Sequence, residues 1–249
     1  YTKYIYIWYN IIYGVDLMII IFSPTKTFTN EKVTSLSKPH FLNKANILIE
    51  QLKQFKIIDF KDKFKISDSL AKKTKDYYDN IHNNYAAVYQ YGGTSFKFLD
   101  PHNINKNSLS NLYILSGLYG ILNAFDGISP YRLEMLDTNL TNLYNFWQED
   151  ITNYLKNLNK PIINLASNEY SKVIQFEQLN IVTLDFKYII NDKLLMNSMQ
   201  LKKLRGLFAN YILNNNLTNF KEIKNISING FSFNNNLSNE NYYLFTKEE

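Results

Sequence analysis

The sequence predicts a single α/β domain, a mixed α+β arrangement of helices around a mixed sheet. Short apolar runs typical of buried strands lie between segments with apolar residues at helical spacing. The two kinds of segment intermingle without strict alternation, which favours a mixed sheet over a purely parallel one. No linker rich in Pro, Gly or Ser interrupts the pattern, and 249 residues can bury one sizeable core.

The first half of the chain is expected to supply three strands and two helices. The expected strands are residues 18–22, 86–91 and 112–115, and the expected helices are residues 43–55 and 67–81. The first strand ends at Ser23-Pro24, which is typical of a turn. Ser67 is placed to cap the second helix. Gly92-Gly93 marks a turn after the second strand.

The second half is expected to contain three helices and a closing hairpin. The expected helices are residues 143–158, a short one after Ser167, and residues 201–213; the expected strands are residues 161–166, 181–187, 226–233 and 242–245. The helix assignments follow from spacing, as when Leu143, Trp147 and Ile151 share one face. The last two strands flank an Asn-rich loop and are predicted to pair as a hairpin.

The first seventeen residues are interpreted as an upstream extension that contributes nothing to the fold. Their apolar run, residues 4–13, is shorter than the roughly 20 residues of a membrane span. They also lack the small-residue cleavage site of a signal peptide. We therefore expect one domain over residues 18–249, a cytoplasmic location and no membrane partner.

Composition narrows the classes of site that the chain can carry. It has no cysteine, which excludes disulfides, thiolate zinc sites and cysteine nucleophiles. His40, His82 and His102 are widely separated, so no metal site and no cofactor is expected. A net charge of +5 and a pI near 9.0 favour a polyanionic partner. Among 27 basic residues only Arg132 and Arg205 are arginines, which indicates positions where a bidentate fork matters.

Two polar segments follow predicted strands and are candidate anion sites. Ligands favour the carboxyl ends of strands in open α/β sheets. Hydroxyls, a lysine and free amides in such turns can hold a phosphate, and a helix N-terminus can do the same. The alternative for each segment is a capped structural turn. The candidate residues are Ser23, Thr25, Lys26, Thr27, Asn164 and Ser167.

Three further segments allow both a functional and a structural interpretation. Residues 115–120 (LSGLYG) resemble a glycine hairpin that presents amides to a DNA phosphate, or a tight structural turn. In residues 130–135 (PYRLEM), Arg132 can grip an oxyanion beside Glu134, or the two can form an internal ion pair. Residues 202–206 (KKLRG) can supply cations to a ligand or form a solvated helix face, and Gly206 permits a close approach.

Taken together, these motifs resemble the YaaA family of bacterial peroxide-stress proteins from residue 18 to near the C-terminus. The resemblance is carried by SPTKT, SGLYG, PYRLEM and NLASNEY, in that order. It implies a fold particular to the family, with a positively charged cleft and a helix-hairpin-helix-like element. It also implies a role in peroxide resistance, limitation of iron damage, and binding of duplex or distorted DNA. One departure is Thr94, where the family usually has an acid.

The predicted function is sequence-independent binding of DNA through a basic cleft during peroxide stress. The predicted DNA-binding residues are Lys26, Gly117, Tyr119, Gly120, Arg132, Lys202, Lys203 and Arg205. One alternative is an enzyme acting on nucleic acid or a nucleotide, with Glu134 or Glu169 as acid or base. A second alternative is an iron-handling protein. The sequence leaves the oligomeric state and any catalytic activity open.

Overall fold

A nine-stranded mixed sheet organises the part of the chain, residues 17–248, that the computed structural model describes. Residues 1–16 lie outside the described residues, and with them nearly all of the expected extension. The five central strands are parallel. They run in the order β3 (Leu112–Ser116), β1 (Ile19–Phe22), β6 (Ile162–Asn164), β7 (Ile181–Ile190) and β11 (Tyr242–Glu248). The predicted α/β class with a mixed sheet is confirmed.

Antiparallel strands add to this parallel core, three of them along the edges and one on the far end of the inner strand β7. They are β4 (Gly120–Asn123) on β3, β8 (Lys193–Leu195) on β7, β10 (Phe231–Phe233) on β11 and β9 (Ser227–Ile228) on β10. The pairing of β10 with β11 confirms the predicted closing hairpin, but the expected strand 226–233 is divided into β9 and β10, because Asn229 and Gly230 turn the chain back on itself with positive φ. A separate two-stranded sheet pairs β2 (Tyr85–Ala86) with β5 (Gly127–Ile128).

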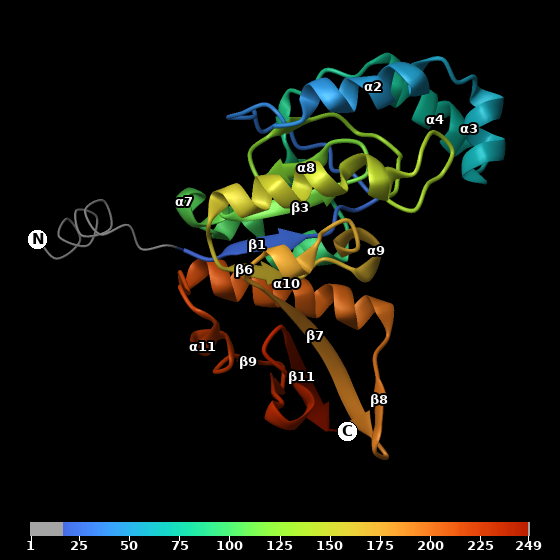
Figure 1. Ribbon diagram of the computed structural model, residues 1–249. Helices are drawn as coiled ribbons and strands as arrows, with labels where there is room; N and C mark the ends of the chain where they lie inside the picture. The colour runs from blue at the N-terminus through green and yellow to red at the C-terminus, as the bar shows by residue number, and fades with distance from the viewer. Residues whose placement is uncertain (1–16, 249) are drawn as a thin grey trace, which may run out of the picture.

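Helices cover the sheet and form a cluster at one end of the molecule. They are α2 (Leu42–Lys53), α3 (Ile57–Phe64), α4 (Asp68–Asp79), α5 (Ala87–Gln90), α6 (Thr94–Leu99), α7 (Lys106–Leu109), α8 (Leu143–Leu158), α9 (Asn168–Ser171), α10 (Ser198–Asn214) and α11 (Phe220–Ile223). Figure 1 shows α2, α3 and α4 together at one end and β7, β8 and β11 at the other. All four residues of β1 are buried, so both of its faces are covered.

The helix predictions are confirmed where spacing was regular, and the strand prediction for residues 86–91 is wrong. Ser67 caps α4 as expected, because its hydroxyl accepts a hydrogen bond from the Leu70 amide at 3.3 Å. Residues 86–91 were expected to form a strand, but only the two end residues pair, Ala86 with Gly127 and Tyr91 with Phe28, and residues 87–90 form the helix α5. All four residues of α5 are buried, and a short run that is buried on every side shows no period by which to tell helix from strand.

The topology places two loops side by side at the centre of the sheet. In the register of the parallel strands β1 and β6, Ile21 pairs with Asn164, so the strands end together. From β1 the chain continues to β3 on one side, whereas from β6 it continues to β7 on the other. Such a reversal of direction opens a crevice at the carboxyl ends of the strands, the usual ligand site in open α/β sheets.

Candidate functional site

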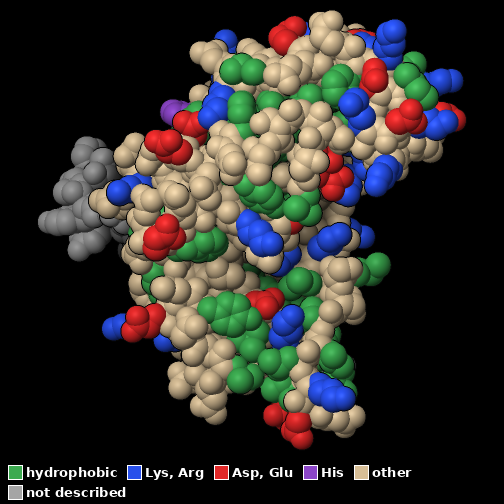
Figure 2. Space-filling model, turned by 45° about the vertical axis from the view of Figure 1, so that its right-hand side comes forward, with side chains coloured by type: hydrophobic (Ala, Val, Ile, Leu, Met, Phe, Trp, Pro, Cys, Tyr) green, Lys and Arg blue, Asp and Glu red, His purple; other side chains and the backbone are tan. Residues whose placement is uncertain are grey.

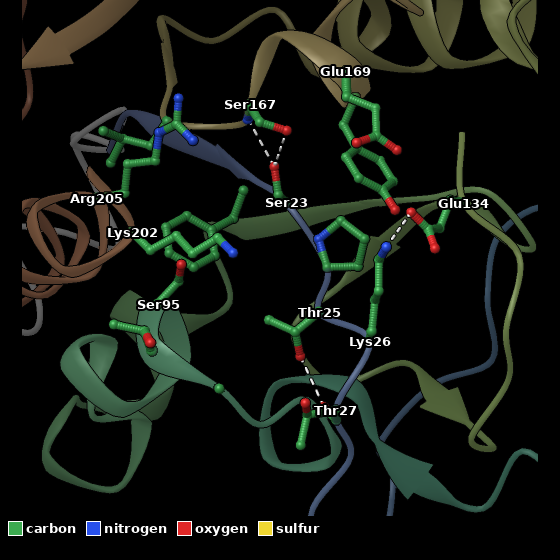
Figure 3. A pocket seen from close by; sticks show the side chains of 16 residues that line it. Ser23, Thr25, Lys26, Thr27, Ser95, Glu134, Ser167, Glu169, Lys202 and Arg205 are labelled. Atoms are coloured by element: carbon green, nitrogen blue, oxygen red, sulfur yellow. Dashed lines mark hydrogen bonds and ion pairs between the residues drawn. The ribbon is translucent and has the colours of Figure 1, made fainter. Parts of the chain in front are cut away.

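A pocket of about 430 Å³ occupies this crevice. Its walls come from five parts of the chain that are distant in sequence. These are residues 22–27 at the end of β1 and after it, residues 165–170 after β6, the start of α6, Glu134, and the first turns of α10. Figure 3 shows Lys202 and Arg205 on one side of the pocket, with Lys26 and Glu134 on the other. The structure therefore brings together most of the predicted anion-binding residues.

Hydroxyl groups hold the two central loops in place. The Ser167 amide donates a hydrogen bond to Ser23 Oγ at 2.7 Å, and Ser23 Oγ donates to Ser167 Oγ at 3.2 Å. Since Ser167 Oγ accepts in this pair, its own hydrogen is free to point at a ligand. The Thr25 hydroxyl donates to the Gly92 carbonyl at 2.6 Å and lies 2.8 Å from the Thr27 carbonyl, so it ties the loop to the turn before α6. Ser23 and Thr25 thus shape the pocket.

Asn164 was predicted to bind the anion but does not line this pocket. Its Nδ2 donates to Thr183 Oγ1 at 3.1 Å, and its Oδ1 accepts from the Ala166 amide at 3.0 Å. Both bonds fix the end of β6, which is the structural alternative. Asn164 faces a second pocket on the opposite side of the loop.

A close helix contact positions two of the cations. A Cβ at Gly206 would lie 2.3 Å from the Ser95 carbonyl oxygen, so only glycine lets α10 approach α6 this closely. This confirms the prediction that Gly206 admits another chain segment. The contact brings Lys202 and Arg205 to the pocket, opposite the start of α6. Burial lowers the pKa of the Arg205 guanidinium, and the charge of Asp185 opposes that effect.

Two carboxylates face the cations, and their surroundings differ. Glu134 Oε2 is paired with Lys26 Nζ at 2.6 Å. Burial raises the pKa of the Glu169 carboxyl, and the nearby charge of Glu134 raises it further. Glu169 Oε1 is buried and has no hydrogen-bond partner among the described residues. A carboxyl group with a raised pKa keeps its proton to a higher pH than usual, which favours a role as a general acid or base.

The charges lining the pocket favour a small anion. Lys26, Lys202 and Arg205 oppose Glu134 and Glu169, which leaves a balance of 3 − 2 = +1. A proton on Glu169 would raise that balance to +2. A phosphodiester carries one negative charge and a phosphate monoester up to two, so both match the pocket.

The remaining predicted basic residues lie elsewhere. Arg132 contacts Glu134 from outside the pocket, with Nη2 3.8 Å from Oε1, and its carbonyl accepts a hydrogen bond from the Tyr78 hydroxyl at 2.9 Å. Lys203 lies over the ring of Phe98, 5.1 Å from its centre. The geometry of Arg132 agrees with the internal ion pair more than with the oxyanion grip.

The glycine hairpin requires a correction. Residues 115–120 join the antiparallel strands β3 and β4, so this segment is not a helix-hairpin-helix. Gly117, Tyr119 and Gly120 are all buried, and the amides of Leu118 and Tyr119 donate to Ser116 Oγ. These amides therefore bind the chain itself. The tight structural turn, the alternative interpretation of this motif, describes the segment.

Sequence reasoning missed one wall of the pocket. Gly93, Thr94 and Ser95 line it at the start of α6. The Gly92-Gly93 pair was the available signal: Gly93 has φ of +89°, a conformation that favours glycine, and it begins the helix. Because Gly93, Thr94 and Ser95 are uncharged, this wall carries no charge.

The wider surface is mixed in charge. On the face in Figure 2, basic side chains are interspersed with acidic ones and do not form one continuous patch. Over residues 17–248, no helix is long and apolar enough to cross a membrane. Within the same range, no group of three or more His, Asp or Glu side chains is arranged to hold a metal ion.

Comparison with known proteins finds one family over nearly the whole chain. The model of a family described as peroxide stress protein YaaA matches residues 18–237. A UPF0246 protein of Clostridium botulinum is 36% identical, covering 93% of this chain and 100% of its own length. A UPF0246 protein of Fusobacterium nucleatum is 37% identical over 93% of this chain and 99% of its own. One of Crocosphaera subtropica is 36% identical over 92% and 100%.

Proposed function

Because the chain belongs to the peroxide stress protein YaaA family, we propose that it binds DNA under peroxide stress and takes one nucleotide into the pocket, where Glu169 transfers a proton. The observation that carries this proposal is the convergence of Lys26, Lys202 and Arg205 on a pocket that also holds a carboxyl group with a raised pKa. A protein that only binds phosphates has no need of a partly buried carboxyl group among its cations.

The size of the pocket favours a single nucleotide over a duplex. Ligand pockets commonly measure on the order of 300–1,000 Å³, and this one falls in that range. Enzymes that act on a base take it out of the stack, and distorted DNA gives up a nucleotide more easily than a regular duplex. Recognition through phosphate is independent of base sequence, and the basic composition favours such a polyanionic partner.

Some side chains of the pocket bind the phosphate, and Glu169 transfers the proton. Lys202 and Arg205 hold the phosphate from one side, and the Ser167 hydroxyl donates from the loop. Lys26 is held by Glu134 and stands beside Glu169, whose charged form it stabilises. Glu169 is the acid or base, since its buried oxygen has no other partner among the described residues.

The test compares two adjacent lysines with the same charge. Lys202→Ala removes a pocket cation, whereas Lys203→Ala removes an equal charge outside the pocket. We expect Lys202→Ala to weaken binding of thymidine 5′-monophosphate and of mismatched DNA about tenfold, the effect of one charged hydrogen bond. Lys203→Ala should change either affinity less than about threefold. Equal losses in the two variants, or no binding at low salt, would refute the proposal.

Catalysis is tested separately with Glu169→Gln. This variant keeps the size of the side chain but cannot exchange a proton. DNA containing mismatches is incubated with each protein, and strand cleavage and base release are followed by gel and by chromatography. We expect the natural protein to form a product, and the variant to bind equally well and form none. A product formed equally by both would remove Glu169 from the mechanism.

A further inference from the structure

A second pocket, of about 570 Å³, lies behind the loop that follows β6. The segment runs from the end of β6 through Ser167, the N-cap of α9, into the first turn of that helix. Its residues divide between the two pockets. Leu165, Ser167 and Glu169 face the first pocket, and Asn164, Ala166 and Asn168 face the second. The loop is thus a single wall shared by two cavities.

Arg205 is the charged side chain that lines both pockets. Its Nε is buried and has no hydrogen-bond partner among the described residues. The guanidinium is a rigid fork of donors that matches the oxygens of a phosphate. A planar cation with an unused donor at the junction of two cavities is suited to an anion that extends into both of them.

The second pocket has the lining of a nucleoside site. It offers polar groups in Asn168 and Thr183, and at Tyr242, whose hydroxyl donates to Asp185 Oδ2 at 2.8 Å. Phe176 supplies an aromatic surface. Amide and hydroxyl groups can bond the edges of a base, and an aromatic ring can stack on its face.

We infer that the two pockets form one site for a dinucleotide segment of a single strand, with Arg205 at the phosphodiester that joins the two nucleosides. The inference rests on the proposed function, since it assumes that the first pocket binds a nucleotide. It adds the substrate class: a strand with an internal phosphodiester, and not a free mononucleotide. Each pocket has the volume for one nucleoside, and the linking phosphate carries the single charge that Arg205 can pair.

The experiment measures the affinity of two probes by isothermal titration calorimetry at one salt concentration. The probes are thymidine 5′-monophosphate and the 5′-phosphorylated thymidine dinucleotide. We expect the dinucleotide to bind at least tenfold more tightly to the natural protein. Arg205→Lys keeps the charge but loses the fork, and it should bring the two affinities within threefold of each other.

Because Arg205 is largely enclosed, a matched pair of exposed lysines supports the measurement. Lys172 lines only the second pocket, and Lys193 lies in β8, away from both. Lys172→Ala should weaken dinucleotide binding at least threefold and leave the monophosphate within twofold. Lys193→Ala should change neither affinity.

The outcomes distinguish this inference from the proposed function. A monophosphate that binds in the first pocket, with a dinucleotide that binds no more tightly, overturns the inference and leaves the proposed function standing. Equal effects of Lys172→Ala and Lys193→Ala also overturn it, because they would reflect overall charge. A monophosphate that does not bind at all overturns both.

Discussion

The pocket loop at residues 23–27 and the turn at residues 115–120 are similar in sequence and position, but their polar groups differ in availability to a ligand. Both follow a central parallel strand, and both combine small hydroxyl residues with a turn. In the turn, Ser116 Oγ accepts from two amides and lies 2.7 Å from the Tyr131 hydroxyl, all of it buried. In the pocket, Lys26 and Thr27 remain exposed. Proximity to a strand end is therefore insufficient for a site; the polar groups must also be left unused by the chain.

The glycine at position 117 serves packing within the fold. Gly117 is required for packing, since a Cβ there would lie 2.5 Å from the Leu133 carbonyl oxygen. That approach carries the 133–134 segment past the turn and helps to place Glu134 beside the pocket. The turn thus supports the site from behind without touching a ligand.

The largest expected effect is on stability, from Gly117→Ala. The added methyl group meets a backbone atom that cannot move aside, so we expect a loss of about 3 kcal/mol, as for overpacking in a core. Gly92→Ala is the control, because its Cβ would lie 3.4 Å from the nearest atom and should cost below about 1 kcal/mol. Urea unfolding measures both. Equal stability of the two variants would show that the turn is not tightly packed.

A smaller effect is expected from Arg132→Lys. The change keeps the charge beside Glu134 and loses only the shape of the fork, so we expect about 1 kcal/mol of lost stability and unchanged nucleotide affinity. Thermal unfolding and calorimetry on the same variant decide the matter. A tenfold loss of affinity at unchanged stability would instead make Arg132 part of the binding site.

The smallest effect concerns the pH dependence of stability through Glu169. Its pKa is raised in the folded protein, so between the unfolded and folded pKa values the folded state holds more protons. This group therefore contributes stability at low pH that is lost as the pH rises through the folded pKa. Solvent screens a partly exposed group, so the change should be about 0.5 kcal/mol.

Glu169→Gln should remove this slope. Unfolding by urea between pH 4 and pH 8 is compared for the natural protein and the variant, and their difference isolates Glu169 from Asp126 and Asp137, whose pKa values burial also raises. Parallel curves for the two proteins would mean that Glu169 titrates as it does in the unfolded chain.

The sequence by itself determined the elements that depend on local chemistry. The apolar run at residues 18–22 predicted β1, and Ser67 marked the start of α4, because each signal acts within a few residues. The polar segments after β1 and β6 were identified in the same way. The rarity of arginine singled out Arg205, which lies at the junction of the two pockets.

Only the tertiary structure decided which of these polar segments meet and which are buried. Ser23 and Ser167 are 144 positions apart, and their hydrogen bonds form because β1 and β6 are neighbours in the sheet. The turn at residues 115–120 carries the same kinds of residue, but the 133–134 segment covers it. The availability of a donor depends on contacts between distant parts of the chain, and no local pattern records those contacts.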